Sequence, residues 1–313
     1  MLISVIIPCY NEDDVVLESY GRLRDVFRSN GILDYELLFI NNGSIDRTLE
    51  LLREIADKDS RVKILGLSRN FGHQAAVSAG LNECLGDVAV IIDADLQDPP
   101  EVILEMLSVY EQEGCNVVYG VRKKRKGESF FKVLTAKLFY RILNYLSDSS
   151  FPVDTGDFRL VDRKVIDAFR RLPEKNKYIR GLISWMGFKQ VPVYFDRDSR
   201  FAGETKYPLG NLLKLATTGM LYFSKKPLQL ATSIGFISIL IGIAMAVWVF
   251  SSLIFGTEYI VAGWTSTVII IIFFGGVQLL TIGVLGQYIG SLFDEVKNRP
   301  EYIISERINI TGS

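Results

Sequence analysis

The stretch VAVIIDADLQDPP, residues 88–100, joins an apolar run to a cluster of oxygen-bearing side chains. Residues 88–92 are rich in β-branched side chains and too few for a helix, so they predict a buried strand, which the pair of prolines then ends. Asp93, Asp95 and Gln97 occupy alternate positions, and alternate side chains of an extended chain point the same way. We therefore expect three oxygen-bearing side chains together at the mouth of a buried strand.

Apolar runs of the same kind recur along the first 120 residues, and segments with helical periodicity fill the gaps between them. Strands that alternate with helices predict βαβ units. The fold class is therefore α/β, with a mainly parallel, Rossmann-like sheet covered by helices on both faces. The expected strands are 3–7, 36–40, 62–65, 88–92 and 116–120, and the expected helices are 13–29, 46–57, 73–84 and 99–113.

A polar cluster follows each of the first four expected strands. Turn residues alone could explain any one of them. Ligands of such sheets, however, bind beyond the carboxyl ends of the strands, where all four clusters would meet. We therefore predict one binding crevice lined by PCYNED (8–13), NNGSID (41–46), GLSRNFGH (66–73) and DADLQD (93–98).

Charge and residue counts exclude several classes of function. The chain has 35 Lys and Arg against 36 Asp and Glu, so no basic field favours nucleic acid as a partner. His73 is the only histidine, which argues against a histidine-based triad or a zinc site with several histidine ligands. Cys9, Cys84 and Cys115 form no CxxC pair, so we expect reduced, buried thiols.

Two long uncharged intervals lie in the last third of the chain. No charged residue occurs between Lys226 and Glu258, or between Glu258 and Asp294. Each interval exceeds the ~20 residues that a membrane-spanning helix needs. A buried core helix is the alternative, but runs of this length predict two membrane spans.

Basic residues flank the outer ends of this pair of spans, so the positive-inside rule places both chain termini in the cytoplasm. We expect a multi-pass protein of the inner (plasma) membrane. Residues 129–146 and 206–226 combine basic and aromatic side chains and are expected as interfacial helices. The predicted organisation is a cytosolic α/β domain (1–205), a juxtamembrane amphipathic helix (206–226), two transmembrane helices (227–293) and a cytosolic C-terminal tail (294–313).

The Asp-x-Asp pair within DADLQ suggests a metal site. Two neighbouring carboxylates repel each other unless a cation lies between them or one is protonated. Mg²⁺ or Mn²⁺ would satisfy them, and such ions complete their shell with water and diphosphate oxygens. Asp93, Asp95 and Gln97 are the candidate ligands. A solvated loop after a strand is the alternative, and for a bare Asp-x-Asp it is the common case.

Six ordered motifs carry a resemblance to a known family: PCYNE (8–12), NNGSIDRT (41–48), SRNFGHQAA (68–76), DADLQDPPE (93–101), GDFRLVDR (156–163) and RFAGETKY (200–207). Together they resemble glycosyltransferase family 2, and most closely its polyprenyl-phosphate branch. That branch includes dolichol-phosphate mannose synthases and the bactoprenol glucosyltransferases, which the two-span tail also resembles. The resemblance covers about residues 1–226. It implies a GT-A fold, a nucleotide-sugar donor and a polyprenyl phosphate acceptor.

The resemblance also implies roles for individual residues on the donor side. Asp93, Asp95 and Gln97 would hold the metal. One departure concerns Asn42, because the family usually has an acid there that accepts the N–H of uracil. An amide oxygen can still accept that bond, so UDP remains the expected nucleotide. The residues expected at the nucleotide are Pro8, Tyr10, Asn11, Glu12, Asn42, Gly43, Ser44 and Asp93.

Asp157 matches the proposed catalytic acid of the family, and Arg159 accompanies it. A phosphate monoester with a second pKa near ~6 is already mostly dianionic at neutral pH. Asp157 would therefore orient substrate and balance charge as much as remove a proton. A helix cap before residues 162–171, or an ion pair with Arg159, is the alternative. For the acceptor phosphate the resemblance singles out Arg122, Arg200 and Lys206.

Together, the residues and the resemblance predict that the chain transfers a hexose, most simply glucose, from a UDP-sugar to undecaprenyl phosphate. The transfer would invert the anomeric carbon and take place at the cytosolic membrane face. Mannose or an aminoarabinose donor would use the same chemistry. A processive polysaccharide synthase is an alternative on the same catalytic fold, although the Q-x-x-R-W element is absent. A non-catalytic nucleotide-sugar sensor is another. The bilayer is an expected partner, and the resemblance to bactoprenol enzymes implies a homotetramer.

Overall fold

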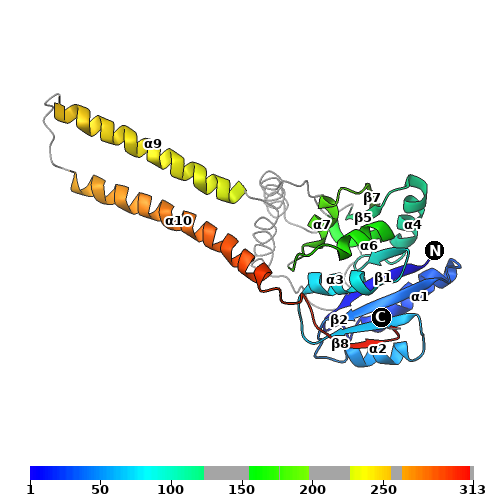
Figure 1. The fold of residues 1–313 in the computed structure, drawn as a ribbon. Helices are drawn as coiled ribbons and strands as arrows, with labels where there is room; N and C mark the ends of the chain where they lie inside the picture. Colours follow the sequence, from blue (N-terminus) through cyan, green and yellow to red (C-terminus); the bar gives the residue numbers. More distant parts are fainter. Residues whose placement is uncertain (123–154, 176, 197–225, 255–262, 311–313) are drawn as a thin grey trace. The chain divides into compact units, whose positions relative to one another are not determined.

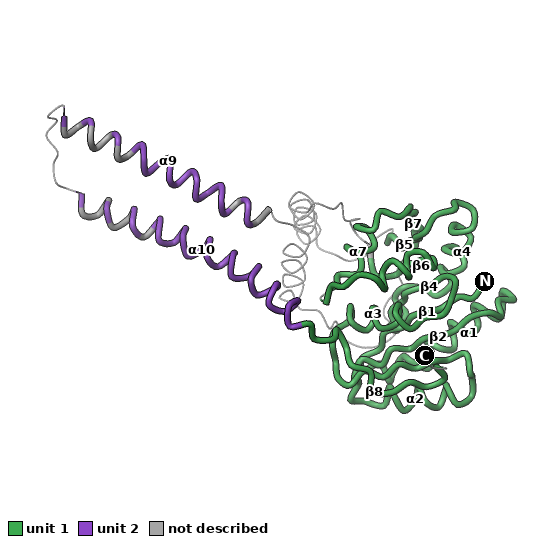
Figure 2. The backbone as a smooth tube through the Cα atoms, in the orientation of Figure 1, with its two compact units in different colours: residues 1–140, 149–211, 298–313 green, residues 141–148, 212–297 purple. Residues whose placement is uncertain are grey.

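A computed structural model describes residues 1–122, 155–175, 177–196, 226–254 and 263–310 of the 313-residue chain (Figure 1). The chain divides into two compact units, drawn in green and purple in Figure 2. Unit 1 comprises residues 1–140, 149–211 and 298–313, and unit 2 comprises residues 141–148 and 212–297. The expected juxtamembrane helix, 206–226, and the expected interfacial helix, 129–146, lie outside the described residues, except that Lys226 begins a helix of unit 2.

Unit 1 is built on a sheet in which eight strands are described. Apolar runs that are shielded on both sides pair in parallel, and this holds for β1 with β2 and β4, for β2 with β3, and for β5 with β7. The strand order is β7-β5-β6-β4-β1-β2-β3-β8. The bounds are β1 (Ile3–Cys9), β2 (Tyr35–Asn41), β3 (Val62–Leu67), β4 (Val88–Ile91), β5 (Val117–Arg122), β6 (Thr155–Asp162), β7 (Gln190–Phe195) and β8 (Ile304–Ile308). The prediction of an α/β fold with a mainly parallel sheet is confirmed, and β1 to β5 match the expected strands.

Helices cover both faces of the sheet. Alternate side chains of β1, such as Val5 and Ile7, join the core formed with α1, α2 and α4. The other side chains face α3, where a Cβ on Gly80 would lie 2.3 Å from a methyl carbon of Ile6. That close approach lets α3 lie directly on the strands. The helices of unit 1 are α1 (Val16–Ser29), α2 (Thr48–Ala56), α3 (His73–Glu83), α4 (Val102–Glu113), α6 (Arg163–Arg170) and α7 (Ile179–Trp185).

Strand β6 was not among the expected strands, and it shapes the site. It runs antiparallel between β4 and β5, with Arg159 opposite Ile91 on one side and Tyr119 on the other. Asp162, the last residue of β6, caps α6 by accepting a hydrogen bond of 3.0 Å from the backbone N–H of Val165. Asp157 therefore lies inside a central strand, and the alternative that it caps this helix is wrong.

Part of the expected C-terminal tail, 294–313, returns to the sheet. Residues Ile304–Ile308 form β8, antiparallel to β3 at the edge of the sheet. The physical reason is that an edge strand exposes unpaired backbone groups, and the alternating pattern of ISERI fits the pairing. The Arg53 and Glu306 side chains form an ion pair of 2.7 Å across this edge.

Unit 2 contains two long helices, α9 (Lys226–Ile254) and α10 (Trp264–Val296), which lie side by side within the unit (Figure 2). They occupy the two intervals expected to span the membrane. Among the described residues, one helical segment, Phe273–Val296 of α10, is long and apolar enough to cross a bilayer. The shorter segment Ala231–Ala244 is apolar as well.

Candidate active site

The carboxyl ends of β1 and β2 bring the first two polar clusters together, because the strands pair in register up to Cys9 opposite Asn41. The backbone N–H of Asn11 donates to Ser44 Oγ at 3.0 Å, and Asn11 Oδ1 accepts from the N–H of Ile45 at 3.0 Å. The predicted nucleotide residues of the two loops thus hold each other in place. Pro8 lies within β1 and is buried, and Tyr10 and Glu12 follow in the same loop.

Gly43 and Asn42 anchor the second loop against the segment after β3. Gly43 has φ +69°, and a Cβ there would lie 2.3 Å from the carbonyl carbon of Arg69, so the position requires glycine. Asn42 is 4% exposed. Its Oδ1 accepts from the N–H of Phe71 at 2.9 Å, and its Nδ2 donates to Asn70 at 3.2 Å. An amide oxygen has a second lone pair, so the role of Asn42 toward uracil stays a prediction.

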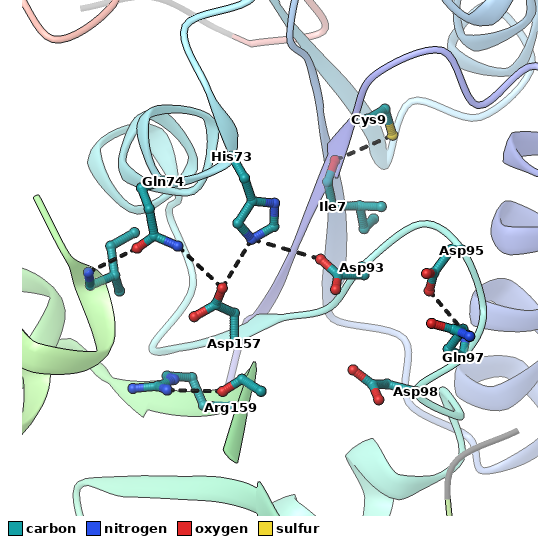
Figure 3. A network of polar contacts seen from close by, with 12 residues as sticks. Ile7, Cys9, His73, Gln74, Asp93, Asp95, Gln97, Asp98, Asp157 and Arg159 are labelled. Atoms are coloured by element: carbon teal, nitrogen blue, oxygen red, sulfur yellow. Dashed lines mark hydrogen bonds and ion pairs between the residues drawn. The ribbon is translucent and has the colours of Figure 1, made fainter. Parts of the chain in front are cut away.

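The loop after β4 carries the three candidate metal ligands (Figure 3). Asp95 Oδ1 accepts a hydrogen bond of 3.1 Å from the backbone N–H of Gln97. Between them, Leu96 is buried and has φ 57°, a backbone conformation that a leucine rarely adopts. Across the described residues, no group of three or more His, Cys, Asp or Glu side chains is placed to hold a metal ion. The ligand set that the sequence suggests is two carboxylates and an amide oxygen.

Asp157 is held by side chains from two helices. Its side chain is 9% exposed. Arg180 of α7 donates from Nε to Oδ1 at 2.6 Å and from Nη2 to Oδ2 at 3.2 Å. Oδ2 also lies 3.1 Å from His73 Nε2 and accepts from Gln74 Nε2 at 3.2 Å. Figure 3 shows His73 between Asp157 and Asp93, whose Oδ1 is 3.8 Å from the same ring nitrogen.

Burial and charge act in opposite ways on these two carboxylates. Burial raises the pKa of Asp93 to about 6; the charge of His73 opposes that rise, and the charges of Asp95 and Asp98 add to it. Burial also disfavours the charge of Asp157, but Arg180 and His73 outweigh it and hold its pKa well below the usual range. The pKa of His73 is about 9, because its contacts with Asp157 and Asp93 outweigh the effect of burial. The region thus contains an ionised Asp157 beside an imidazolium.

Arg122, at the end of β5, contacts the loop after β4. Its Nη2 lies 3.3 Å from Oδ1 of Asp98, which is 1% exposed. The other predicted acceptor residues, Arg200 and Lys206, lie outside the described residues. Arg159 is buried, its Nη2 donates to the carbonyl of Gly156 at 3.1 Å, and burial lowers its pKa to about 10.

Four polar residues around Asp157 and the loop after β4 were not assigned a role from the sequence. They are His73, Gln74, Asp98 and Arg180. His73 and Gln74 stand in a motif that carries the family resemblance, so their place at the start of a helix after β3 was a usable signal. Arg180 had none, because it lies in a helix that the sequence did not predict.

The fold is an α/β sheet with polar loops at the carboxyl ends of its strands, which is where proteins of this class bind their ligands. A family model described as "Glycosyl transferase family 2" matches residues 4–170. The chain belongs to this family and is a glycosyltransferase of the GT-A fold.

Similar proteins cover nearly the whole chain. An uncharacterized glycosyltransferase, YkcC of Bacillus subtilis (strain 168), is 50% identical over 307 residues, which is 98% of this chain and 94% of that protein. The SfII prophage-derived bactoprenol glucosyl transferase of Shigella flexneri is 38% identical over 307 residues, 98% of each chain.

Among solved structures, glucosyl-3-phosphoglycerate synthase from Mycobacterium tuberculosis, in complex with Mn²⁺, UDP and glucosyl-3-phosphoglycerate, matches 70% of this chain and 77% of that chain. The TM-score is 0.47 and the sequence identity 21%.

Proposed function

We propose that this chain transfers glucose from UDP-glucose to a polyprenyl phosphate, with inversion at the anomeric carbon. The observation that carries the proposal is the 38% identity to a bactoprenol glucosyl transferase over 98% of both chains. The site supports it, since Asp157 is paired with Arg180 and contacts His73, whose ring nitrogen lies 3.8 Å from Asp93.

The chemistry is one displacement. An oxygen of the lipid phosphate attacks the anomeric carbon, the bond from that carbon to the UDP oxygen breaks, and UDP leaves with the electron pair. The lipid phosphate is already nucleophilic at neutral pH, so no strong base is required. This agrees with Asp157, whose low pKa and hydrogen bonds suit a group that orients and balances charge rather than one that accepts a proton.

Asp93, Asp95 and Gln97 would hold Mg²⁺ or Mn²⁺. The raised pKa of Asp93 fits this role, because it reflects a desolvated carboxylate close to other acids, which a divalent cation would stabilise in its charged form. When bound, the ion would neutralise charge on the departing diphosphate. The nucleotide would lie over the loops after β1 and β2, against Pro8, Tyr10, Asn11, Glu12, Asn42, Gly43 and Ser44.

Because the acceptor would be a membrane lipid, the catalytic unit would act at the cytosolic face of the inner membrane. Helices α9 and α10 would form a two-span hairpin with both termini cytoplasmic, and residues 206–226 would lie at the headgroups. Arg122, Arg200 and Lys206 would bind the phosphate of the lipid, and a tetramer is the proposed assembly. Basic side chains suit this task because Arg binds phosphate in a bidentate manner.

The test is transfer by the purified full chain. UDP-[¹⁴C]glucose, Mn²⁺ and undecaprenyl phosphate should give labelled lipid that partitions into organic solvent. UDP-glucose should also compete better than GDP-mannose or a UDP-aminoarabinose derivative for the donor site. Formation of a polymer would instead favour a processive synthase. Donor binding without transfer to any lipid phosphate would contradict the proposed reaction.

A further inference from the structure

We propose that Gln74 and Arg180 are positioning residues, which set the orientation of the Asp157 carboxylate from two different helices. The proposal rests on the proposed function, in that Asp157 is taken to face the substrates. It assigns the two residues a role in the reaction that operates through Asp157.

Arg180 fixes the carboxylate through a fork. Its Nε and Nη2 donate to separate oxygens of Asp157, at 2.6 and 3.2 Å. A planar guanidinium bound to both oxygens determines the rotation of the carboxylate as well as its charge. The Arg180 side chain is 26% exposed and Asp157 is 9% exposed, so the pair is largely shielded from water. Lysine would keep the charge but lose the planar geometry.

Gln74 joins the carboxylate to the backbone that carries Arg180. Its Nε2 donates to Asp157 Oδ2 at 3.2 Å, and its Oε1 accepts from the N–H of Ile179 at 2.9 Å. Ile179 is the first residue of α7 and precedes Arg180. One amide group therefore fixes both the carboxylate and the start of the helix that clamps it, as Figure 3 illustrates for Gln74 and Asp157.

The chemical type of residue 74 matters for this arrangement. The amide supplies a donor toward the carboxylate and an acceptor toward the backbone N–H. A glutamate would place a second negative charge against Asp157, and a lysine could not accept the N–H bond. Since Asp157 Oδ2 also contacts His73, the carboxylate is held by three side chains.

Kinetics of two single variants and their double variant test the proposal. Gln74→Ala and Arg180→Lys should each lower kcat about 10-fold or more, with the KM for the donor within about 2-fold, because misplacement of a reacting group by about 1 Å costs on the order of 100-fold. The double variant should lose less than the product of the single losses, since both act through one carboxylate. Multiplicative losses, or a raised donor KM with kcat intact, would overturn the assignment.

Asn82→Ala is the matched control. Asn82 lies in α3, the helix that carries Gln74. The substitution removes one side-chain hydrogen bond, of 2.9 Å from Asn82 Nδ2 to the Tyr302 hydroxyl, and leaves the contacts of Asp157 in place. The kcat of this variant should stay within about 2-fold of that of the unsubstituted chain, because substitutions of partly exposed residues away from a site have small effects. Thermal unfolding of all variants separates loss of folded protein from loss of turnover.

Hydrogen–deuterium exchange gives a readout that does not depend on the lipid substrate. The Ile179 amide should exchange faster in Gln74→Ala than in Asn82→Ala, because it loses its acceptor. Unchanged exchange would overturn the role of Gln74. If the unsubstituted chain shows no transfer while this exchange difference is present, the proposed reaction fails and the positioning contacts stand.

Discussion

Two regions of the site each hold an aspartate, and the pKa values of the two aspartates are shifted in opposite directions. In the loop after β4, burial raises the pKa of Asp93 to about 6, and the charges of neighbouring acids add to the rise. On β6, the pKa of Asp157 lies well below the usual range, because Arg180 and His73 outweigh burial. The Asp157 side chain is 9% exposed and that of Asp93 is 36% exposed, so the more shielded carboxylate is the one with the lowered pKa, and the difference comes from the charges around them.

The difference indicates a division of roles. In the β6 region, Arg180 and His73 supply positive charge to the carboxylate of Asp157. In the loop after β4, the neighbouring acids raise the pKa of Asp93, and a divalent ion would favour its charged form. His73 lies between the two regions, 3.1 Å from Asp157 and 3.8 Å from Asp93, and so connects them electrostatically.

The largest expected effect comes from removing the charge of Asp157. Asp157→Asn keeps the shape but turns one oxygen into an NH₂ group that opposes the donors of Arg180. We expect kcat to fall about 100- to 1,000-fold, the range seen when a preorganised electrostatic group is lost. Steady-state transfer assays at saturating donor and acceptor measure this. Activity within 10-fold of that of the unsubstituted chain would contradict the proposed role of the Asp157 charge in turnover.

Removing charge from the other region should weaken donor binding instead. Asp95→Ala should reduce the affinity for UDP in the presence of Mn²⁺ by about 10- to 100-fold. Loss of a residue that only supports a metal ligand already lowers metal affinity by about this factor. Calorimetric titration with UDP, with and without EDTA, measures it. The matched comparison is Asp157→Asn, in which UDP affinity should change little. Equal UDP binding with EDTA present would remove the metal from this loop.

Arg122 tests whether the loop after β4 also serves the acceptor. Its contact with Asp98 means that a neutral substitution would leave a buried acid without this partner, so Arg122→Lys is the cleaner change. We expect the KM for the lipid phosphate to rise about 3- to 10-fold, because lysine keeps the charge and loses the second hydrogen bond of the bidentate contact, and a typical hydrogen bond contributes about 0.5–1.5 kcal/mol. The donor KM should stay constant. A change in the donor KM alone would assign Arg122 to the nucleotide side.

The sequence predicted the parts of the fold whose signal is local. Strands β1 to β5 follow from apolar runs, and the polar loops follow from strand ends, which is how the sequence placed Asp93 and Asp95 just after a strand. By contrast, β6 pairs antiparallel with two strands distant in the sequence, and β8 pairs with β3 across most of the chain, so their register depends on contacts that no local pattern encodes.

The same reason explains the site residues that were missed. Gln74 and Arg180 meet Asp157 across separations of 83 and 23 residues. A short helix such as Ile179–Trp185 carries too few turns to show a clear periodicity. The family resemblance singled out Asp157 as a candidate, and the fold shows which groups contact it.

Substitution of Glu301 is expected to have the smallest effect on turnover. It tests how burial shifts the pKa of a carboxylate that has no bidentate contact of the kind Arg180 makes with Asp157. Its side chain is 12% exposed, accepts from Ser78 Oγ at 2.8 Å and lies 3.8 Å from Lys177. Burial nevertheless raises its pKa from 4.5 to about 7, since neither contact compensates fully. In this respect it resembles Asp93 more than Asp157.

The sign of the pH dependence follows from linkage. Between pH 4.5 and 7 the folded chain holds a proton on Glu301 that the unfolded chain has lost, so stability falls as pH rises through this window. Glu301→Gln mimics the protonated form and should remove that fall, worth up to about 3 kcal/mol, with turnover within about 2-fold. Thermal unfolding at pH 4.5 and pH 8 should show equal stability at the lower pH and a more stable variant at the higher. A parallel pH dependence in both proteins would mean that Lys177 neutralises Glu301 as fully as Arg180 neutralises Asp157.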